Sequence, residues 1–205
     1  SAANNYQGPT SLMEWAGDWS VTVVAQFSST APGDYIMSKM TAGTVGWTLY
    51  KPGVGSVAAY LHNSALRSIT CPGIYAINTP AVISFGRSGG TLYCKMNSGG
   101  TGSVAVGTMG SAAATPVSLG VWSAVGAPTT TIHEVYATTT PFSETTVAAL
   151  QASVMAKINQ GTLTSCPANS LAVSAQGAEV WAARTNIPTS VGLAVGPWTT
   201  NTLTV

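Results

Sequence analysis

TPAVISFGRSGGTLYCKMNSG, residues 79–99, is the stretch that decides the fold. Its first half alternates between two sets of side chains, Ala81, Ile83 and Phe85 on one face and Val82, Ser84 and Gly86 on the other. This period of two is typical of a β-strand. Arg87–Gly90 ends in two glycines, which adopt the positive φ angles of a tight turn without strain. Thr91–Met96 suits a returning strand, so the stretch predicts a β-hairpin with its turn at Arg87–Gly90.

Many other segments have the same period and are separated by turn residues such as Pro32-Gly33 and Pro52-Gly53. The strands predicted outside the hairpin are 19–27, 35–40, 46–51, 56–62, 67–70, 102–108, 117–122 and 131–136. The predicted core consists of Trp19, Val21, Val23, Phe27, Trp47, Leu49, Ile83 and Phe85. Short strands at this spacing indicate an all-β, two-sheet sandwich or jelly roll.

One segment late in the chain has a helical period instead. Val147, Leu150, Val154 and Ile158 recur at helical spacing, and Ser143 suits the N-cap position, which predicts a helix over about 143–158. Beyond it, residues 161–205 form a C-terminal extension to a sandwich that spans 1–160. Its Trp181 and Trp198 would expose apolar area in water, so we expect it to dock on the sandwich or on a neighbouring copy.

Composition limits the partners of the chain. Only 6% of its 205 residues are charged, against roughly 25% in an average domain. The net charge of +1 comes from scattered basic residues, which excludes a nucleic-acid groove, and no apolar run is long enough for a membrane span. A neutral surface rich in Ser, Thr and Gly predicts an extracellular protein with an uncharged partner such as a sugar, or one that associates with its own copies.

Three cysteines are present, at Cys71, Cys94 and Cys166, and no pair has the CxxC spacing of a zinc or thioredoxin-like site. A Cys71–Cys94 disulfide forms if the strand-flanking segments are neighbours. Three buried free thiols are the alternative. The sequence leaves both open, and it does not indicate a partner for Cys166.

Aromatic side chains on two predicted strands are candidates for ligand contact. In GWTLYK, Trp47 and Leu49 share one face and Tyr50 lies on the other. In SVAAYLH, Tyr60 and His62 share the face opposite the apolar residues. Sugar rings pack their C–H faces on such rings, so Tyr50, Tyr60 and His62 are the predicted ligand-binding residues, provided that they cluster. Otherwise each packs under a loop or against the second sheet.

The order of these segments resembles a laminin-G-like module of the concanavalin A-like superfamily. The matching pieces are WSVTVVAQF, IMSKM, GWTLYK, SVAAYLH, the hairpin, PVSLGVW and TIHEVYATTTPFSETTVAAL, and together they span about residues 19–155. The resemblance implies a two-sheet antiparallel jelly roll. It also implies that a structural calcium ion is to be considered, for which Asp34, in the loop before Tyr35, is the candidate metal ligand.

Concanavalin A-like folds also include glucanases and polysaccharide lyases, but catalytic groups are not found here. A retaining glycosidase needs two carboxyl groups about 5–5.5 Å apart, and the glucanase-like ExDxxE pattern does not occur. His133 and Glu134 are adjacent on a strand, where neighbours point to opposite faces, so we expect His133 to make a cross-strand hydrogen bond. The chain is therefore predicted not to be an enzyme and to use no cofactor.

A second resemblance covers the C-terminus. EVWAARTNIPTSVGLAVGPWTTNTLTV is similar to a segment of phage tail and bacterial surface proteins that carries a TN pair and a later Trp. Its matching positions are Glu179, Ala183, Arg184, Thr185, Asn186, Trp198 and Val205. This resemblance implies an extracellular or virion-surface location and a chain that is one piece of a longer protein.

Together these observations predict a non-catalytic extracellular module that recognises a carbohydrate or a cell surface. The alternative is a self-assembling subunit of a phage tail, sheath or extracellular filament. The third hypothesis is a polysaccharide-cleaving enzyme.

Overall fold

The computed structural model describes residues 17–41, 45–63, 65–108, 115–119 and 130–159, together with short strands at 5–7 and between 173 and 201. The first eight strands are β1 (Asn5–Gln7), β2 (Trp19–Phe27), β3 (Tyr35–Thr41), β4 (Val45–Gly53), β5 (Ser56–Asn63), β6 (Ala65–Thr70), β7 (Pro80–Ser88) and β8 (Thr91–Met96). They are followed by β9 (Gly102–Ala105), β10 (Ser118–Leu119), β11 (Thr130–Thr138), α1 (Glu144–Asn159), β12 (Val173–Ser174), β13 (Ala178–Ala182), β14 (Leu193–Ala194) and β15 (Thr199–Asn201).

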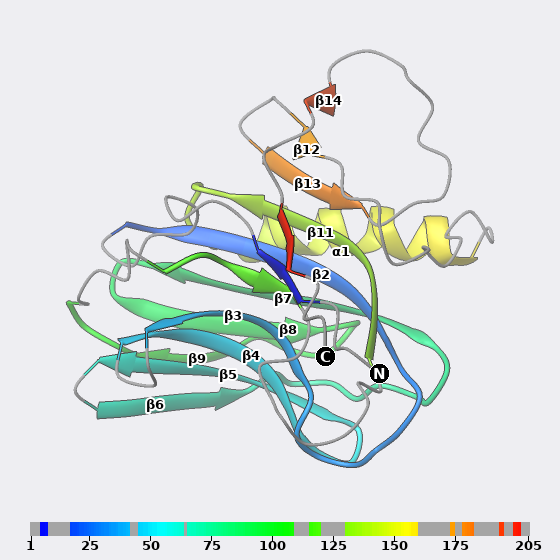
Figure 1. Ribbon diagram of the computed structural model, residues 1–205, viewed down its shortest axis with the longest axis horizontal. Coiled ribbons are helices and arrows are strands. Elements are labelled where there is room, and N and C mark those ends of the chain that lie inside the picture. Colours follow the sequence, from blue (N-terminus) through cyan, green and yellow to red (C-terminus); the bar gives the residue numbers. More distant parts are fainter. Residues whose placement is uncertain are drawn as a thin grey trace.

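Two antiparallel sheets form a jelly-roll sandwich (Figure 1). One has seven strands in the order β15-β1-β10-β3-β4-β5-β6, and the other has six in the order β13-β11-β2-β7-β8-β9. The predicted all-β, two-sheet jelly roll is therefore confirmed. No helix within the described residues is long and apolar enough to cross a membrane.

The hairpin that decides the fold lies inside the six-stranded sheet. β7 pairs with β8 from Ile83↔Met96 to Ser88↔Thr91. The turn is therefore shorter than the predicted Arg87–Gly90 and consists of Gly89 and Gly90, with φ of 54° and 80°. Two positive φ angles match the right-handed twist of the flanking strands, so the ladder continues to the last residue before the turn.

The core lies between the two sheets and contains all eight residues that the sequence predicts for it. At its centre, the Trp19 ring lies 5.3 Å from both Trp47 and Phe85, and Trp47 lies 5.2 Å from Phe85. These three rings come from β2, β4 and β7, so they join the two sheets.

Helix α1 covers the outer face of the six-stranded sheet. Its Val154 packs on Val24 and Val82, and the buried Gln151 side chain donates a hydrogen bond to the Ser84 hydroxyl at 3.0 Å. In Figure 1 α1 lies beside β11, on the side of the molecule away from β4, β5 and β6. The outer face of β3–β6 is therefore the face that α1 leaves uncovered.

The C-terminal strands add to both sheets of the same chain. β13 pairs antiparallel with β11, from Glu134↔Ala182 to Thr138↔Ala178, and β15 pairs with β1. β12 and β14 form a separate two-stranded sheet. The backbone of the extension thus continues the sandwich, while the domain division at residue 160 stays a prediction.

Candidate functional site

The outer face of the seven-stranded sheet is built by simple alternation along β4 and β5. Trp47 and Leu49 point into the core with 1% and 0% of their surface exposed. Tyr50 lies on the opposite face of β4, and Tyr60 lies on the corresponding face of β5, because it pairs with Thr48. Both tyrosines are half-buried. The structure therefore brings two of the predicted ligand-binding residues together.

A third tyrosine, which sequence reasoning missed, completes this cluster. Period-two counting on β3 places Tyr35 on the same face as Met37, which is in the core. A β-bulge overrides this count, since Tyr35 pairs with Tyr50 and Met37 pairs with Leu49, leaving Ile36 as the extra residue. The bulge turns Tyr35 to the outer face, where its ring centroid lies 5.7 Å from that of Tyr50.

The three rings form one continuous surface, which we call the tyrosine row: Tyr35, Tyr50 and Tyr60. The Tyr50 and Tyr60 centroids are 4.7 Å apart with the rings at 65°, an edge-to-face contact. The Tyr60 hydroxyl donates a hydrogen bond to the Tyr50 hydroxyl at 3.1 Å. Burial, together with this hydrogen bond, raises the pKa of Tyr60 to about 12, so the Tyr60 hydroxyl stays neutral at physiological pH.

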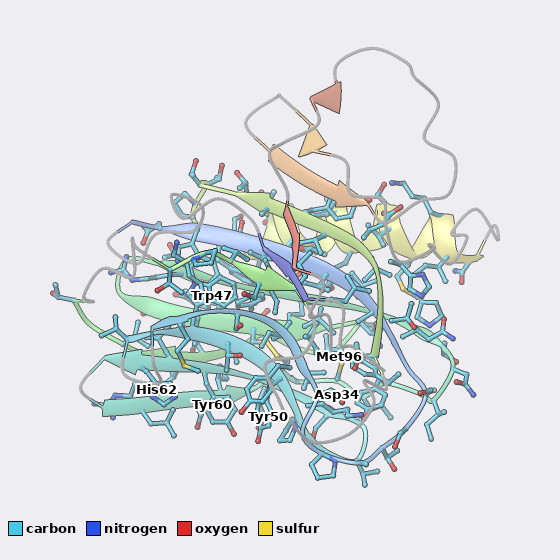
Figure 2. The ribbon with its side chains drawn as sticks, in the orientation of Figure 1. Asp34, Trp47, Tyr50, Tyr60, His62 and Met96 are labelled. Carbon is cyan, nitrogen blue, oxygen red and sulfur yellow. A yellow bond between two sulfur atoms is a disulfide. The ribbon has the colours of Figure 1, made fainter. Side chains whose placement is uncertain are left out.

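His62 continues the row along β5. It pairs with Gly46 and lies on the same face as Tyr60, two residues away. Figure 2 shows His62, Tyr60 and Tyr50 in line along one side of the molecule, while Trp47 lies between the sheets. All three predicted ligand-binding residues thus share one face.

The neighbours of the tyrosine row carry hydroxyl groups. The ladder row that crosses β3 to β6 through Tyr60 consists of Ser38, Thr48, Tyr60 and Ser68. Thr48 donates its hydroxyl proton to the Met37 carbonyl at 3.2 Å, and Ser68 is exposed. Ser38 and Thr48 are buried, with 5% and 4% of their surface exposed, so the exposed hydroxyl group beside the rings in this row is that of Ser68.

Asp34, the candidate metal ligand, faces a cation of its own chain. Its carboxylate lies 3.0 Å from the Lys51 ammonium, whose side chain is fully buried, and accepts a hydrogen bond from the Thr130 hydroxyl at 2.8 Å. The Lys51 ammonium also donates to the Ser29 carbonyl at 3.0 Å. The described residues contain no group of three His, Cys, Asp or Glu side chains that could hold a metal. This geometry gives no support to a metal site, because the Lys51 charge repels a second cation at Asp34.

Cys71 and Cys94 are joined by a disulfide, with their Cα atoms 4.8 Å apart. Cys71 follows β6 and Cys94 lies in β8, so the bond links the two sheets. Both side chains are completely buried. Of the two alternatives that the sequence leaves open, the structure has the disulfide, and Cys166 lies outside the described residues.

A second polar cluster lies under α1, around His133 and Glu134. The expectation that these neighbours point to opposite faces does not apply, because the β11–β2 register shifts between Ile132 and Glu134 and makes His133 the extra residue of a bulge. His133 makes the expected cross-strand hydrogen bond, to the Gln26 side chain at 3.2 Å. Burial lowers its pKa, and the nearby Glu134 carboxylate partly opposes this shift.

Glu134 is 1% exposed and tied to the helix. It accepts a hydrogen bond from the Tyr136 hydroxyl, and that hydroxyl accepts one from the Lys157 ammonium at 3.0 Å. The Lys157 ammonium lies 3.8 Å from the Glu134 carboxylate. Since these contacts hold α1 on the sheet, the cluster has a structural role.

No protein-family model and no curated protein matches the sequence, but solved structures match the fold. The heptameric SAP-like pentraxin from Limulus polyphemus is 13% identical with a TM-score of 0.53, over 73% of this chain and 76% of the pentraxin. The CBM40 domain of the Ruminococcus gnavus IT-sialidase, bound to α2,3-sialyllactose, is 10% identical with a TM-score of 0.52, over 66% of this chain and 83% of the domain.

The binding domain of botulinum neurotoxin serotype C1 is 14% identical with a TM-score of 0.52, over 71% of this chain and 38% of that one. At identities this low, the likeness shows a shared fold. The chain therefore shares an all-β jelly-roll sandwich fold with these structures.

Proposed function

We propose that this chain is a non-catalytic glycan-binding module and that the tyrosine row, with His62, is its binding surface. The observation that carries the proposal is the convergence of Tyr35, Tyr50 and Tyr60, from three adjacent strands, on the face that α1 leaves uncovered. Sugar rings have apolar C–H faces and polar edges, so they fit a surface of aromatic rings bordered by hydroxyl groups.

Two structural neighbours add support. The CBM40 domain is bound to sialyllactose, and the neurotoxin segment is a binding domain. The buried disulfide favours an oxidising compartment, which agrees with an extracellular or virion-surface module.

Alanine substitutions in the row test the proposal. We expect the wild-type chain to bind members of a broad glycan array, and Tyr50→Ala and Tyr60→Ala each to weaken the best interaction by about tenfold or more, or ~1.4 kcal/mol. Tyr93→Ala is the matched control, because Tyr93 lies in the other sheet and stacks on Phe142 at 5.2 Å. Isothermal titration calorimetry on variants with checked thermal melts gives the affinities.

Two results contradict the proposal. One is a wild-type chain that binds no member of the array. The other is a Tyr50→Ala or Tyr60→Ala variant that binds as tightly as the Tyr93→Ala control.

A further inference from the structure

The face that carries the tyrosine row has few ionisable side chains. On the outer face of β3–β6, within the residues that the structure describes, His62 is the only side chain of the Asp, Glu, Lys, Arg or His type. The ladder row next to that of Tyr60 consists of Tyr35, Tyr50, Ala58 and Thr70, and it is likewise uncharged. In these two rows a ligand therefore meets the half-buried tyrosine rings and the exposed hydroxyl groups of Ser68 and Thr70.

The basic residues of the same strands point the other way. Lys39 pairs with Trp47 on the core side and is 0% exposed, and Lys51 is buried beside Asp34. Arg67 pairs with Leu61, which is in the core, so it lies on the face opposite to Ser68 and Tyr60. A carboxylate held against the tyrosine row would lose water and gain no ammonium or guanidinium partner in exchange.

The hydrogen bond between the hydroxyl groups of Tyr60 and Tyr50 has a defined direction. Tyr60 donates its proton to Tyr50, and so the Tyr50 proton remains to be donated. No acceptor for it lies among the residues that the structure describes. A donating hydroxyl that already accepts a hydrogen bond is polarised and becomes a better donor. Tyr50 is therefore suited to a neutral acceptor of a ligand, such as a sugar hydroxyl or ring oxygen.

We infer that the tyrosine row selects uncharged glycans, stacking their C–H faces on its rings and donating one hydrogen bond from Tyr50, and that it discriminates against sialylated and uronic-acid sugars. This inference rests on the proposed function, and it differs from what a sialyllactose-bound neighbour would suggest by analogy. The specificity comes from what this chain places on the face, and not from the shared fold.

Matched pairs of ligands test the inference. The probes are lactose against α2,3-sialyllactose, and linear xylo-oligosaccharide against the same oligosaccharide carrying glucuronic acid. We expect the neutral member of any pair that binds to have a Kd at least tenfold lower than its acidic counterpart. An acidic member that binds as tightly as the neutral one, or more tightly, overturns the inference while leaving glycan binding intact. Failure of every neutral and acidic glycan on the array contradicts the proposed function itself.

Two variants sharpen the test. Ser68→Lys places an ammonium next to Tyr60, because Ser68 is its exposed ladder partner, and we expect it to raise affinity for the acidic members severalfold in a salt-dependent way. Ser98→Lys, at an exposed site after β8, is the control and should change neither member. Tyr50→Phe keeps the ring and removes the donor, and we expect a several-fold loss for neutral ligands. Unchanged binding by both Ser68→Lys and Tyr50→Phe argues against the inference.

Discussion

Asn97, directly after β8, makes hydrogen bonds to neighbouring segments through both its backbone and its side chain. It has a φ of 50°, its backbone N–H donates to the Val82 carbonyl at 2.8 Å, and its side-chain oxygen accepts from the Val82 N–H at 2.9 Å. Its side-chain amide donates to the Ile74 carbonyl at 3.0 Å. Asparagine tolerates a left-handed backbone better than other non-glycine residues, so one side chain satisfies both the turn and its neighbours.

We expect Asn97→Ala to lower the free energy of unfolding by about 2–4 kcal/mol, because it removes two hydrogen bonds and adds left-handed strain. Asn97→Gly should lie between this variant and the wild type, since it relieves the strain but not the lost hydrogen bonds. Urea unfolding gives the values, with the exposed Ser98→Ala as control. Equal stability of Asn97→Ala and Ser98→Ala would show that the side-chain contacts contribute nothing.

His133 makes stability depend on pH. Burial lowers its pKa from the ordinary value of 6.5 despite the nearby Glu134 carboxylate. Below about pH 6.5 the unfolded chain therefore binds more protons at this histidine than the folded chain does. The free energy of unfolding consequently decreases as pH falls. We expect the melting temperature to decrease between pH 7 and about 5.5, and His133→Gln to flatten this part of the profile. A His133→Gln profile with the same slope as the wild type would refute this assignment.

At the scale of elements, the disulfide crosses the sandwich between the end of β6 and β8. It closes a loop with a sequence separation of 23 residues. The chain-entropy relation assigns about 3 kcal/mol to a loop of this size. We expect the Cys71→Ser/Cys94→Ser double variant to be less stable by about this amount in chemical denaturation. Added reductant should destabilise the wild type and leave the double variant unchanged, and an effect of equal size on both would count against the bond.

Regular elements were predictable because their periods are local. β2 occupies the predicted residues, and α1 begins and ends within one residue of the predicted helix. The apolar face of each element is defined by the spacing of residues within that segment, so the element can be predicted without knowing its distant contacts. The placement of Tyr50, Tyr60 and His62 on one face follows from the same rule.

The features that local sequence patterns do not predict are irregular backbone positions and contacts between distant residues. The bulges at Ile36 and His133 insert one residue each, which reverses the side-chain direction that counting gives, and no residue type marks them. The Arg87 guanidinium lies 3.1 Å from the carboxylate of Asp18, which is 69 residues earlier in the chain. Such contacts depend on the register of β2 against β7, and no local pattern in the sequence reveals that register.

At the scale of the whole molecule, three of the four carboxylates whose side chains the structure describes form ion pairs that hold the fold. Asp18 pairs with Arg87, Asp34 with Lys51, and Glu134 with Lys157. Glu144, the fourth acidic residue whose side chain the structure describes, lies in the first turn of α1. A glycosidase needs a carboxyl pair that is free to exchange protons with its substrate, and these groups are committed elsewhere.

We therefore expect no cleavage of polysaccharides. Reducing-sugar and unsaturated-product assays on the array glycans, with a known hydrolase as positive control, measure this directly. Turnover that a point substitution in this chain abolishes would identify an active site and contradict the prediction.

The sandwich has two unlike sides, with α1 and β13 on one (Figure 1) and Tyr50, Tyr60 and His62 on the other (Figure 2). Attachment through the α1 side would leave every row facing outward, whereas attachment through β5 or β6 would bury it against the support. Many copies displayed in the first orientation on a particle would engage a polymeric glycan together, and multivalency can raise the apparent affinity by about 10²–10⁴-fold over that of one copy. Weak contacts of single tyrosine rings would then be enough for lasting adhesion. The side through which the copies are attached would decide whether the coated particle binds the glycan.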